Sequence, residues 1–251
     1  MSLTKIDVAL SVASIIPRIA LISIFVRRRL QRLWPLFFLY CCYSILAEIT
    51  IILSASFLRF GKYFLVYFAC QLVYVVLGLL TMNEAFRRIF SVYYAGHPWF
   101  RFLVPTVVLV VMAISAARWF HYASSTDQIR WAIFLTFQLG GEYSRAAIFG
   151  LFGVLVFIWQ SPWQRHPFAI MKGFGFFTII GMLANLLRSD FGTKMDTFFA
   201  YAPPVAYIVA CFIWLGGFLV PEPEKPASGP GALVNVAELR ELVERLTRAI
   251  R

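Results

Sequence analysis

Four ionisable side chains lie deep inside long apolar stretches of this sequence, and they are the residues best placed to do chemistry. An ionisable group is costly in the hydrocarbon region of a membrane, so it usually faces the interior of a helix bundle and finds a partner there. Carboxyl groups can act as acids, and guanidinium groups can hold anions. The four are Arg18, Glu48, Glu142 and Arg145, and nearer the ends of the stretches lie Glu84, Lys172 and Arg188.

These groups lie at similar depths in their apolar stretches. Arg18 is near the middle of the first stretch, and Glu48 is slightly outside the middle of the second. Glu142 and Arg145 are three residues apart and share one face of a helix. Gly140 and Gly141 precede them, and adjacent glycines loosen a helix where another group can approach. We therefore predict a polar pocket in the outer half of a helix bundle, lined by Arg18, Glu48, Gln71, Glu142, Arg145 and Asn185.

Three interpretations of this pocket stay open. The charges can form structural pairs, Arg18 with Glu48 and Glu142 with Arg145, that only lock helices together. They can instead line a ligand site, or mark a path for an ion or a proton. If the protein is an intramembrane enzyme that protonates a lipophilic substrate, as a cyclase or isomerase does, Glu48 and Glu142 are the candidate catalytic acids.

The apolar stretches themselves predict membrane-spanning helices. The chain is 61% hydrophobic and 14% charged, whereas about a quarter of the residues in a soluble domain are charged. A bilayer core of about 30 Å needs around 20 apolar residues per helix, and these stretches are far longer than a strand. We predict an all-α integral membrane protein, a seven-transmembrane-helix bundle with spans at Ile6–Val26, Leu33–Phe57, Tyr63–Phe86, Phe102–Phe120, Ala132–Trp159, Pro167–Leu187 and Thr197–Val220.

Basic residues in the short loops predict the orientation of the bundle, because such loops stay in the cytoplasm. The densest cluster, Arg27, Arg28, Arg29 and Arg32, is in the first loop. This places the N-terminus outside and the C-terminus in the cytoplasm, with the protein in the plasma membrane or a bacterial inner membrane.

The composition changes abruptly after residue 220, so we divide the chain into three parts. Residues 1–220 form the transmembrane domain, and residues 221–234 form a Pro/Gly-rich linker that cannot bury a core. Residues 235–251 predict a short cytoplasmic amphipathic helix. This helix either lies on membrane lipids or on the protein itself, or it binds a partner chain or a second copy through an apolar seam of Val236, Leu239, Val243, Leu246 and Ile250.

No cofactor or metal site is expected from the sequence. The four cysteines all lie in apolar stretches and the three histidines in loops, so the spacings needed for a metal or a helix-bound haem are missing. The predicted layout is similar to that of rhodopsins and G-protein-coupled receptors, but residues 197–220 contain no lysine to hold retinal. A basic-aromatic patch for nucleic acid is also missing.

We therefore expect a receptor-like or accessory multi-pass membrane protein that binds a small or lipid-like ligand or a partner subunit. The alternatives are the intramembrane enzyme and a structural subunit of a larger membrane complex.

Overall fold

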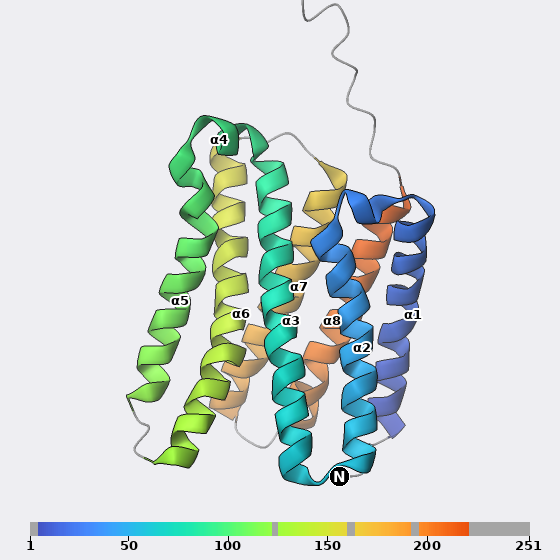
Figure 1. Ribbon diagram of the computed structural model, residues 1–251, viewed down its shortest axis with the longest axis vertical. Helices are drawn as coiled ribbons and strands as arrows, with labels where there is room; N and C mark the ends of the chain where they lie inside the picture. The colour runs from blue at the N-terminus through green and yellow to red at the C-terminus, as the bar shows by residue number, and fades with distance from the viewer. Residues whose placement is uncertain (1–4, 122–124, 160–163, 192–195, 221–251) are drawn as a thin grey trace, which may run out of the picture. The chain divides into compact units, whose positions relative to one another are not determined.

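The computed structural model describes residues 5–121, 125–159, 164–191 and 196–220, and within these ranges the regular structure is entirely helical (Figure 1). The predicted linker and the predicted helix over 235–251 lie outside the described residues. The long helices are α1 (Lys5–Arg27), α2 (Pro35–Phe57), α3 (Phe60–Ile89), α5 (Leu103–Phe120), α6 (Thr126–Trp159), α7 (Arg165–Phe191) and α8 (Asp196–Leu219).

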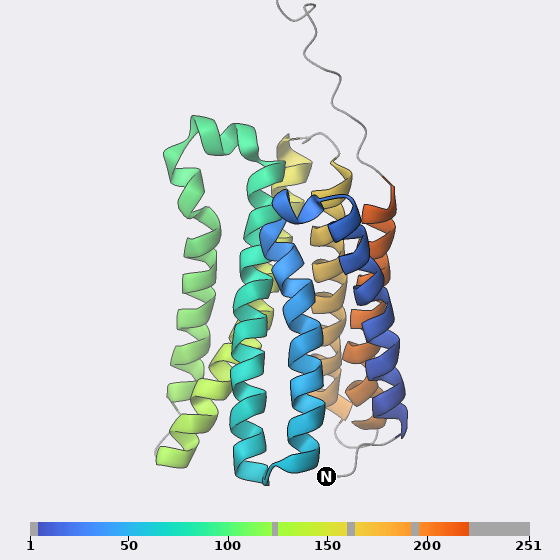
Figure 2. The ribbon, with the colours of Figure 1, turned by 45° about the vertical axis from the view of Figure 1, so that its right-hand side comes forward.

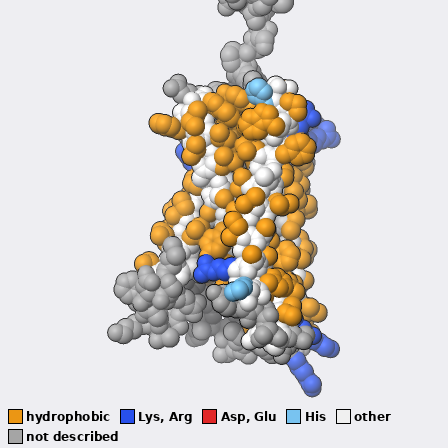
Figure 3. Space-filling view, turned by 90° about the vertical axis from the view of Figure 1, so that its left-hand side faces the viewer, with side chains coloured by type: hydrophobic (Ala, Val, Ile, Leu, Met, Phe, Trp, Pro, Cys, Tyr) orange, Lys and Arg blue, Asp and Glu red, His pale blue; other side chains and the backbone are white. Residues whose placement is uncertain are grey.

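Six helices of the described chain are long and apolar enough to cross a membrane: α2, α3, α5 with the turn before it, α6, α7 and α8. This confirms the predicted all-helical fold, with helices of the length and composition that a membrane span needs. α1, with 23 residues, has a similar length and packs against α8 and α2. Figure 3 shows one face of the bundle, where apolar side chains cover most of the surface and Lys and Arg side chains lie toward the two ends. Such a surface suits contact with lipid rather than water.

The connection over residues 87–101, predicted as a loop, is partly helical. α3 continues to Ile89, and the short helices α4 (Ser91–Gly96) and η2 (Pro98–Phe102) follow it. Pro98 stands at the start of η2, a position where its missing N–H is not needed. The buried ring of Phe100 packs among other aromatic rings, and this burial stabilises a turn that apolar run length alone does not reveal.

α7 is the most buried of the six apolar helices. In the most apolar part of α7, 61% of the residues are buried, compared with at most 28% in the corresponding parts of the other five helices. α7 packs against α8, α6 and α3. It lies behind α3 in Figure 1, and in both Figures 1 and 2 it lies between α6 and α8. α1 and α2 complete one side of the bundle, and α5 packs on α6 at the other.

The two ends of the bundle differ, and we name each after one arginine. The Arg27 end holds the end of α1, η1 (Leu30–Arg32), α4 and the end of α8, and the Arg59 end holds the turn from α2 to α3. At the Arg27 end, both terminal nitrogens of Arg28 donate hydrogen bonds to α8, at 3.1 Å to the carbonyl oxygen of Phe218 and 2.8 Å to that of Leu219. A cation at the carboxyl end of a helix satisfies its last carbonyl groups, so Arg28 stabilises the α8 terminus.

Glycines set the close contacts that position α6. A Cβ atom on Gly140 would lie 2.9 Å from Sδ of Met112 on α5, and one on Gly141 only 2.4 Å from Cγ1 of Val75 on α3. The two adjacent glycines therefore let α6 approach both neighbours just before Glu142.

Candidate functional site

A cavity of about 500 Å³ lies in the half of the bundle toward the Arg59 end. α1, α2, α3, α6, α7 and α8 all contribute side chains to its wall. Five of the predicted pocket residues line it: Arg18, Glu48, Gln71, Glu142 and Arg145. The sixth, Asn185, is not one of the described lining residues, but it contacts one of them, as shown below.

Arg18 and Glu48 form an ion pair between α1 and α2. Arg18 is 2% exposed and Glu48 is 21% exposed, so the carboxylate is the more accessible partner. Ser14 joins the pair, because its hydroxyl lies 3.2 Å from each carboxylate oxygen and accepts a hydrogen bond from Nη2 of Arg18 at 2.5 Å. Each charge is thus compensated by the other and by neutral groups, as a buried pair requires.

The backbone of α1 takes part in holding Arg18. Nε of Arg18 donates to the carbonyl oxygen of Ser14 at 2.8 Å, one helical turn earlier. Pro17 lies between these two residues and lacks an N–H, which loosens the helical hydrogen bonding in this turn. On the far side, the Arg18 guanidinium lies 5.4 Å from the centre of the Tyr207 ring on α8, a favourable cation–π arrangement. Arg18 therefore links three helices.

Arg145 is held in a different way. It is 3% exposed, and its Nε and Nη1 atoms are buried without a hydrogen-bond partner among the residues that the structure describes. Its guanidinium lies 5.3 Å from the centre of the Phe177 ring on α7. A buried donor without an acceptor loses its hydration without replacement, and for a charged group this loss is large. Arg145 is therefore a cation at the cavity wall with unused hydrogen-bonding capacity.

Glu142 does not pair with Arg145. Within the described part of the chain the ion pairs are Arg18 with Glu48 and Arg88 with Glu84, so the expected Glu142–Arg145 pair is not formed. Glu142 instead accepts a hydrogen bond from Nδ2 of Asn185 on α7 at 3.1 Å. Residues three apart on a helix share a face, but the direction of a long side chain depends on the hydrogen-bond partners that neighbouring helices present. Glu142 and Arg145 therefore attract each other without forming the direct ion pair that their spacing predicts.

One face of α3 completes the polar wall with Tyr67, Gln71 and Tyr74, which follow one another at intervals of four and three residues. The hydroxyl of Tyr40, on α2, donates to the hydroxyl of Tyr74 at 2.5 Å. Gln138, on α6, also lines the cavity. The wall thus offers amide and hydroxyl groups of both hydrogen-bonding senses besides its charges.

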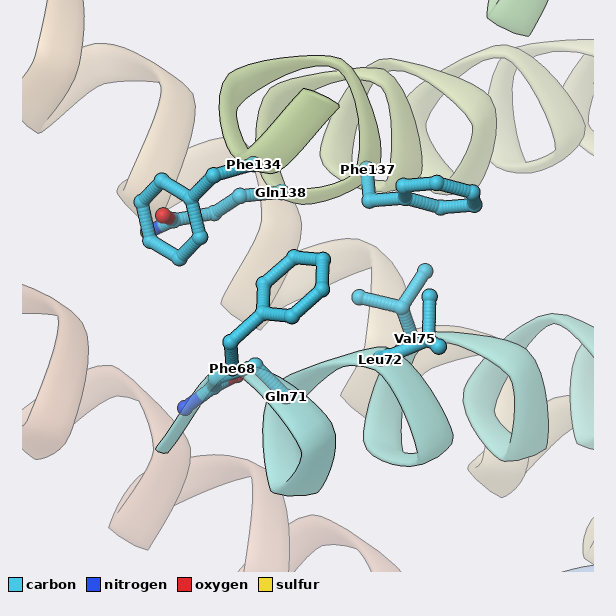
Figure 4. Close-up of a pocket in the computed structure, with 7 residues that line it drawn as sticks. All are labelled: Phe68, Gln71, Leu72, Val75, Phe134, Phe137 and Gln138. Atoms are coloured by element: carbon cyan, nitrogen blue, oxygen red, sulfur yellow. The ribbon is translucent and has the colours of Figure 1, made fainter. Parts of the chain in front are cut away.

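A small apolar recess adjoins these residues between α3 and α6 (Figure 4). Its volume is about 10 Å³, and it shares Gln71, Val75 and Gln138 with the large cavity. In Figure 4 the ring of Phe68 points from α3 toward α6, and its centre lies 5.7 Å from that of Phe134. Aromatic packing therefore borders the polar wall on the side toward the Arg59 end.

Sequence reasoning missed Ser14 and Tyr74 as parts of the site. Each carried a signal, because Ser14 is one turn before Arg18 on the same helix face, and Tyr74 is three residues after Gln71. Hydroxyl groups are common in membrane helices, so this spacing identifies a residue of the site only when the neighbouring helix is known.

Comparison with family models, with characterised proteins and with solved structures gives no match to this chain. Its function is therefore argued from the geometry of the cavity.

Proposed function

We propose that this chain is a seven-span, receptor-like membrane protein that binds a lipophilic ligand with an oxygen-bearing polar end in the cavity of Arg18, Glu48, Gln71, Glu142 and Arg145. The observation that carries the proposal is Arg145, a buried cation at the cavity wall whose Nε and Nη1 have no partner in the described structure. An acceptor group on a ligand would supply the hydrogen bonds that Nε and Nη1 lack, because guanidinium groups bind carboxylate and phosphate oxygens well.

The size and lining of the cavity support a small-molecule ligand. Its volume of about 500 Å³ is within the usual range for ligand sites, about 300–1,000 Å³. Its wall combines the polar groups with apolar ones such as Leu10, Ile51 and Phe177. A ligand that suits this wall has an apolar body and one polar end, as a lipid-like molecule does.

The seven-span topology rests on α1 and on the charges of the loops. α1 contributes Ser14 and Arg18 to the cavity and exposes Ile16 and Ile19 on its other side, as a helix between a bundle and lipid would. The arginines of the first loop favour a cytoplasmic Arg27 end. The cavity then lies in the outer half of the membrane, and a reporter fused after Arg251 would be cytoplasmic.

An intramembrane enzyme is the second candidate, and Glu142 is the residue that favours it. Glu48 is occupied by Arg18 and Ser14, whereas Glu142 lines the cavity with one described hydrogen bond, from Asn185. Glu142 is thus the carboxyl group that can still form hydrogen bonds to a bound substrate. General acid catalysis requires an acid within hydrogen-bond distance of the substrate.

The test replaces Arg145 by methionine, which keeps an unbranched apolar side chain and has no charge. Molecules that copurify with the protein in mild detergent are extracted and identified by mass spectrometry. Wild-type protein should retain a compound with an acidic or carbonyl group, and Arg145→Met should lose it. The melting temperature of the ligand-free variant should be unchanged or raised, because the variant no longer buries hydrogen-bond donors that have no acceptor in the described structure.

Arg130→Met is the matched control, since Arg130 is exposed on the same helix and does not line the cavity. It removes the same charge and should leave the bound compound in place. Equal retention by wild type and Arg145→Met would overturn the role of Arg145. A wild type that carries no compound in any detergent would overturn the ligand-binding function.

A further inference from the structure

A second hollow lies at the Arg27 end, at the opposite end of the bundle from the cavity. The start of α2, the end of α3, α4 and η2 surround it, and its volume is about 680 Å³. None of its described lining residues lines the ligand cavity. We call it the basic groove, and the residues that matter in it are Asn83, Glu84, Arg87, Arg88, Tyr94 and Arg101.

The basic groove has an excess of positive charge. Glu84 is the one acidic side chain among its described lining residues. Glu84 accepts a hydrogen bond from the backbone N–H of Phe37 at 3.2 Å and lies 3.9 Å from Nη2 of Arg88. This leaves Arg87 and Arg101, both exposed, without a direct salt bridge in the described groove, and Glu84 attracts Arg87 only from a longer distance. Two cations facing one hollow attract an anion with more than one charged oxygen.

Neutral groups of the basic groove also lack partners. The hydroxyl of Tyr94 and Oδ1 of Asn83 are buried and make no hydrogen bond within the described structure. A tyrosine hydroxyl is protonated at neutral pH and burial raises the pKa of Tyr94 further, so this hydroxyl is available as a hydrogen-bond donor. Buried polar atoms without partners are uncommon in proteins and call for an explanation such as a missing ligand.

The position of the basic groove selects the kind of anion. The apolar span of α3 ends at Ile89 and the next one begins at Pro98, so the groove lies at the level where the membrane helices end. Leu33 and Phe102 are exposed and lie close in sequence to residues that line the groove. Trp99 is exposed at the same end of the bundle. This combination of basic and aromatic residues is typical of the lipid headgroup region.

The geometry points to a binding site for the phosphate group of an anionic phospholipid in the basic groove, with Arg87 and Arg101 holding the phosphate oxygens and Tyr94 donating a hydrogen bond. The acyl chains would then lie along the apolar outer surface of the neighbouring helices. This site is independent of the cavity ligand.

The experiment titrates the full-length protein, in neutral detergent micelles, with dioctanoyl phosphatidylglycerol and follows the melting temperature. Phosphatidylglycerol should raise it in a saturable way, and dioctanoyl phosphatidylcholine should not. The double variant Arg87→Gln with Arg101→Gln should weaken the apparent affinity at least about tenfold, because each lost charged hydrogen bond is worth roughly that factor. Tyr94→Phe, which removes only the hydroxyl, should weaken it about fivefold to tenfold.

The matched control is Arg27→Gln with Arg29→Gln, which removes two charges from exposed residues at the same end, outside the groove. It should change the affinity by less than about threefold, since these two side chains do not line the groove and act on a bound phosphate only through screened, longer-range attraction. An equal loss in this control, or equal stabilisation by phosphatidylcholine, would overturn the site. If inorganic phosphate alone stabilises wild type as well as phosphatidylglycerol does, the assignment to a lipid is overturned.

Discussion

The two halves of the bundle are packed in different ways. Toward the Arg27 end the core consists of completely buried large side chains such as Phe37, Trp214 and Phe218, and the Phe37 ring contacts the rings of the other two. Toward the Arg59 end the same helices enclose a cavity with two arginines and two carboxyl groups in its wall. The first half is built as a rigid support, and the second half keeps open volume and unused hydrogen-bonding groups, as a binding site does.

The largest expected effect is in the aromatic half. Trp214 is fully buried, its Nε1 donates to the carbonyl oxygen of Ile170 at 3.2 Å, and its ring contacts those of Phe37 and Phe174. Trp214→Ala should lower the free energy of unfolding by about 3–5 kcal/mol, because it leaves a large cavity in a packed core. Denaturant unfolding of the protein in mixed micelles measures this change.

Trp131→Ala is the control for this substitution, because Trp131 is 54% exposed on α6. Its loss should lower the free energy of unfolding by less than about 1.5 kcal/mol. If the two tryptophan substitutions have equal effects, the aromatic half is not the rigid part of the molecule.

The sequence predicted the elements of this fold better than their contacts. Helix positions followed from apolar length, because a bilayer demands that length whatever the fold. The turn at Pro98–Phe102 was missed, since it depends on burial of Phe100 against residues distant in sequence. Among the pocket residues, depth brought the correct helices together, but the partner of Glu142 is Asn185 rather than Arg145. Side-chain direction depends on neighbouring helices, which the sequence does not show.

The second prediction tests the ion pair that the structure describes in the cavity half, that of Arg18 with Glu48. Arg18→Met leaves the Glu48 carboxylate without its cation and should lower the free energy of unfolding by about 3–5 kcal/mol. The double variant Arg18→Met with Glu48→Met should recover most of this loss, because neither charge is then buried alone. The same unfolding measurement applies. A double variant less stable than Arg18→Met would mean that the two side chains stabilise the bundle through other contacts.

The smallest expected effect concerns Glu142, and it separates the two carboxyl groups of the cavity. Glu142→Gln keeps an oxygen that can accept the hydrogen bond from Nδ2 of Asn185, and it breaks no direct ion pair in the described structure. The free energy of unfolding should therefore change by less than about 0.5 kcal/mol.

Binding should nevertheless change in Glu142→Gln, because the side chain lines the cavity and its charge is lost. The compound retained by wild type should be bound more weakly, or its conversion should stop if the protein is an enzyme. Unfolding and extraction are measured on the same preparation, so a folding defect cannot imitate a binding defect. If Glu142→Gln instead lowers the free energy of unfolding by several kcal/mol, Glu142 has a structural role like that of Glu48. A carboxylate stabilises the fold to this extent only where the protein itself compensates its charge. The cavity half would then be held together by both carboxylates, and Arg145, the cation that acts on Glu142, would be its structural partner rather than a group available to a ligand.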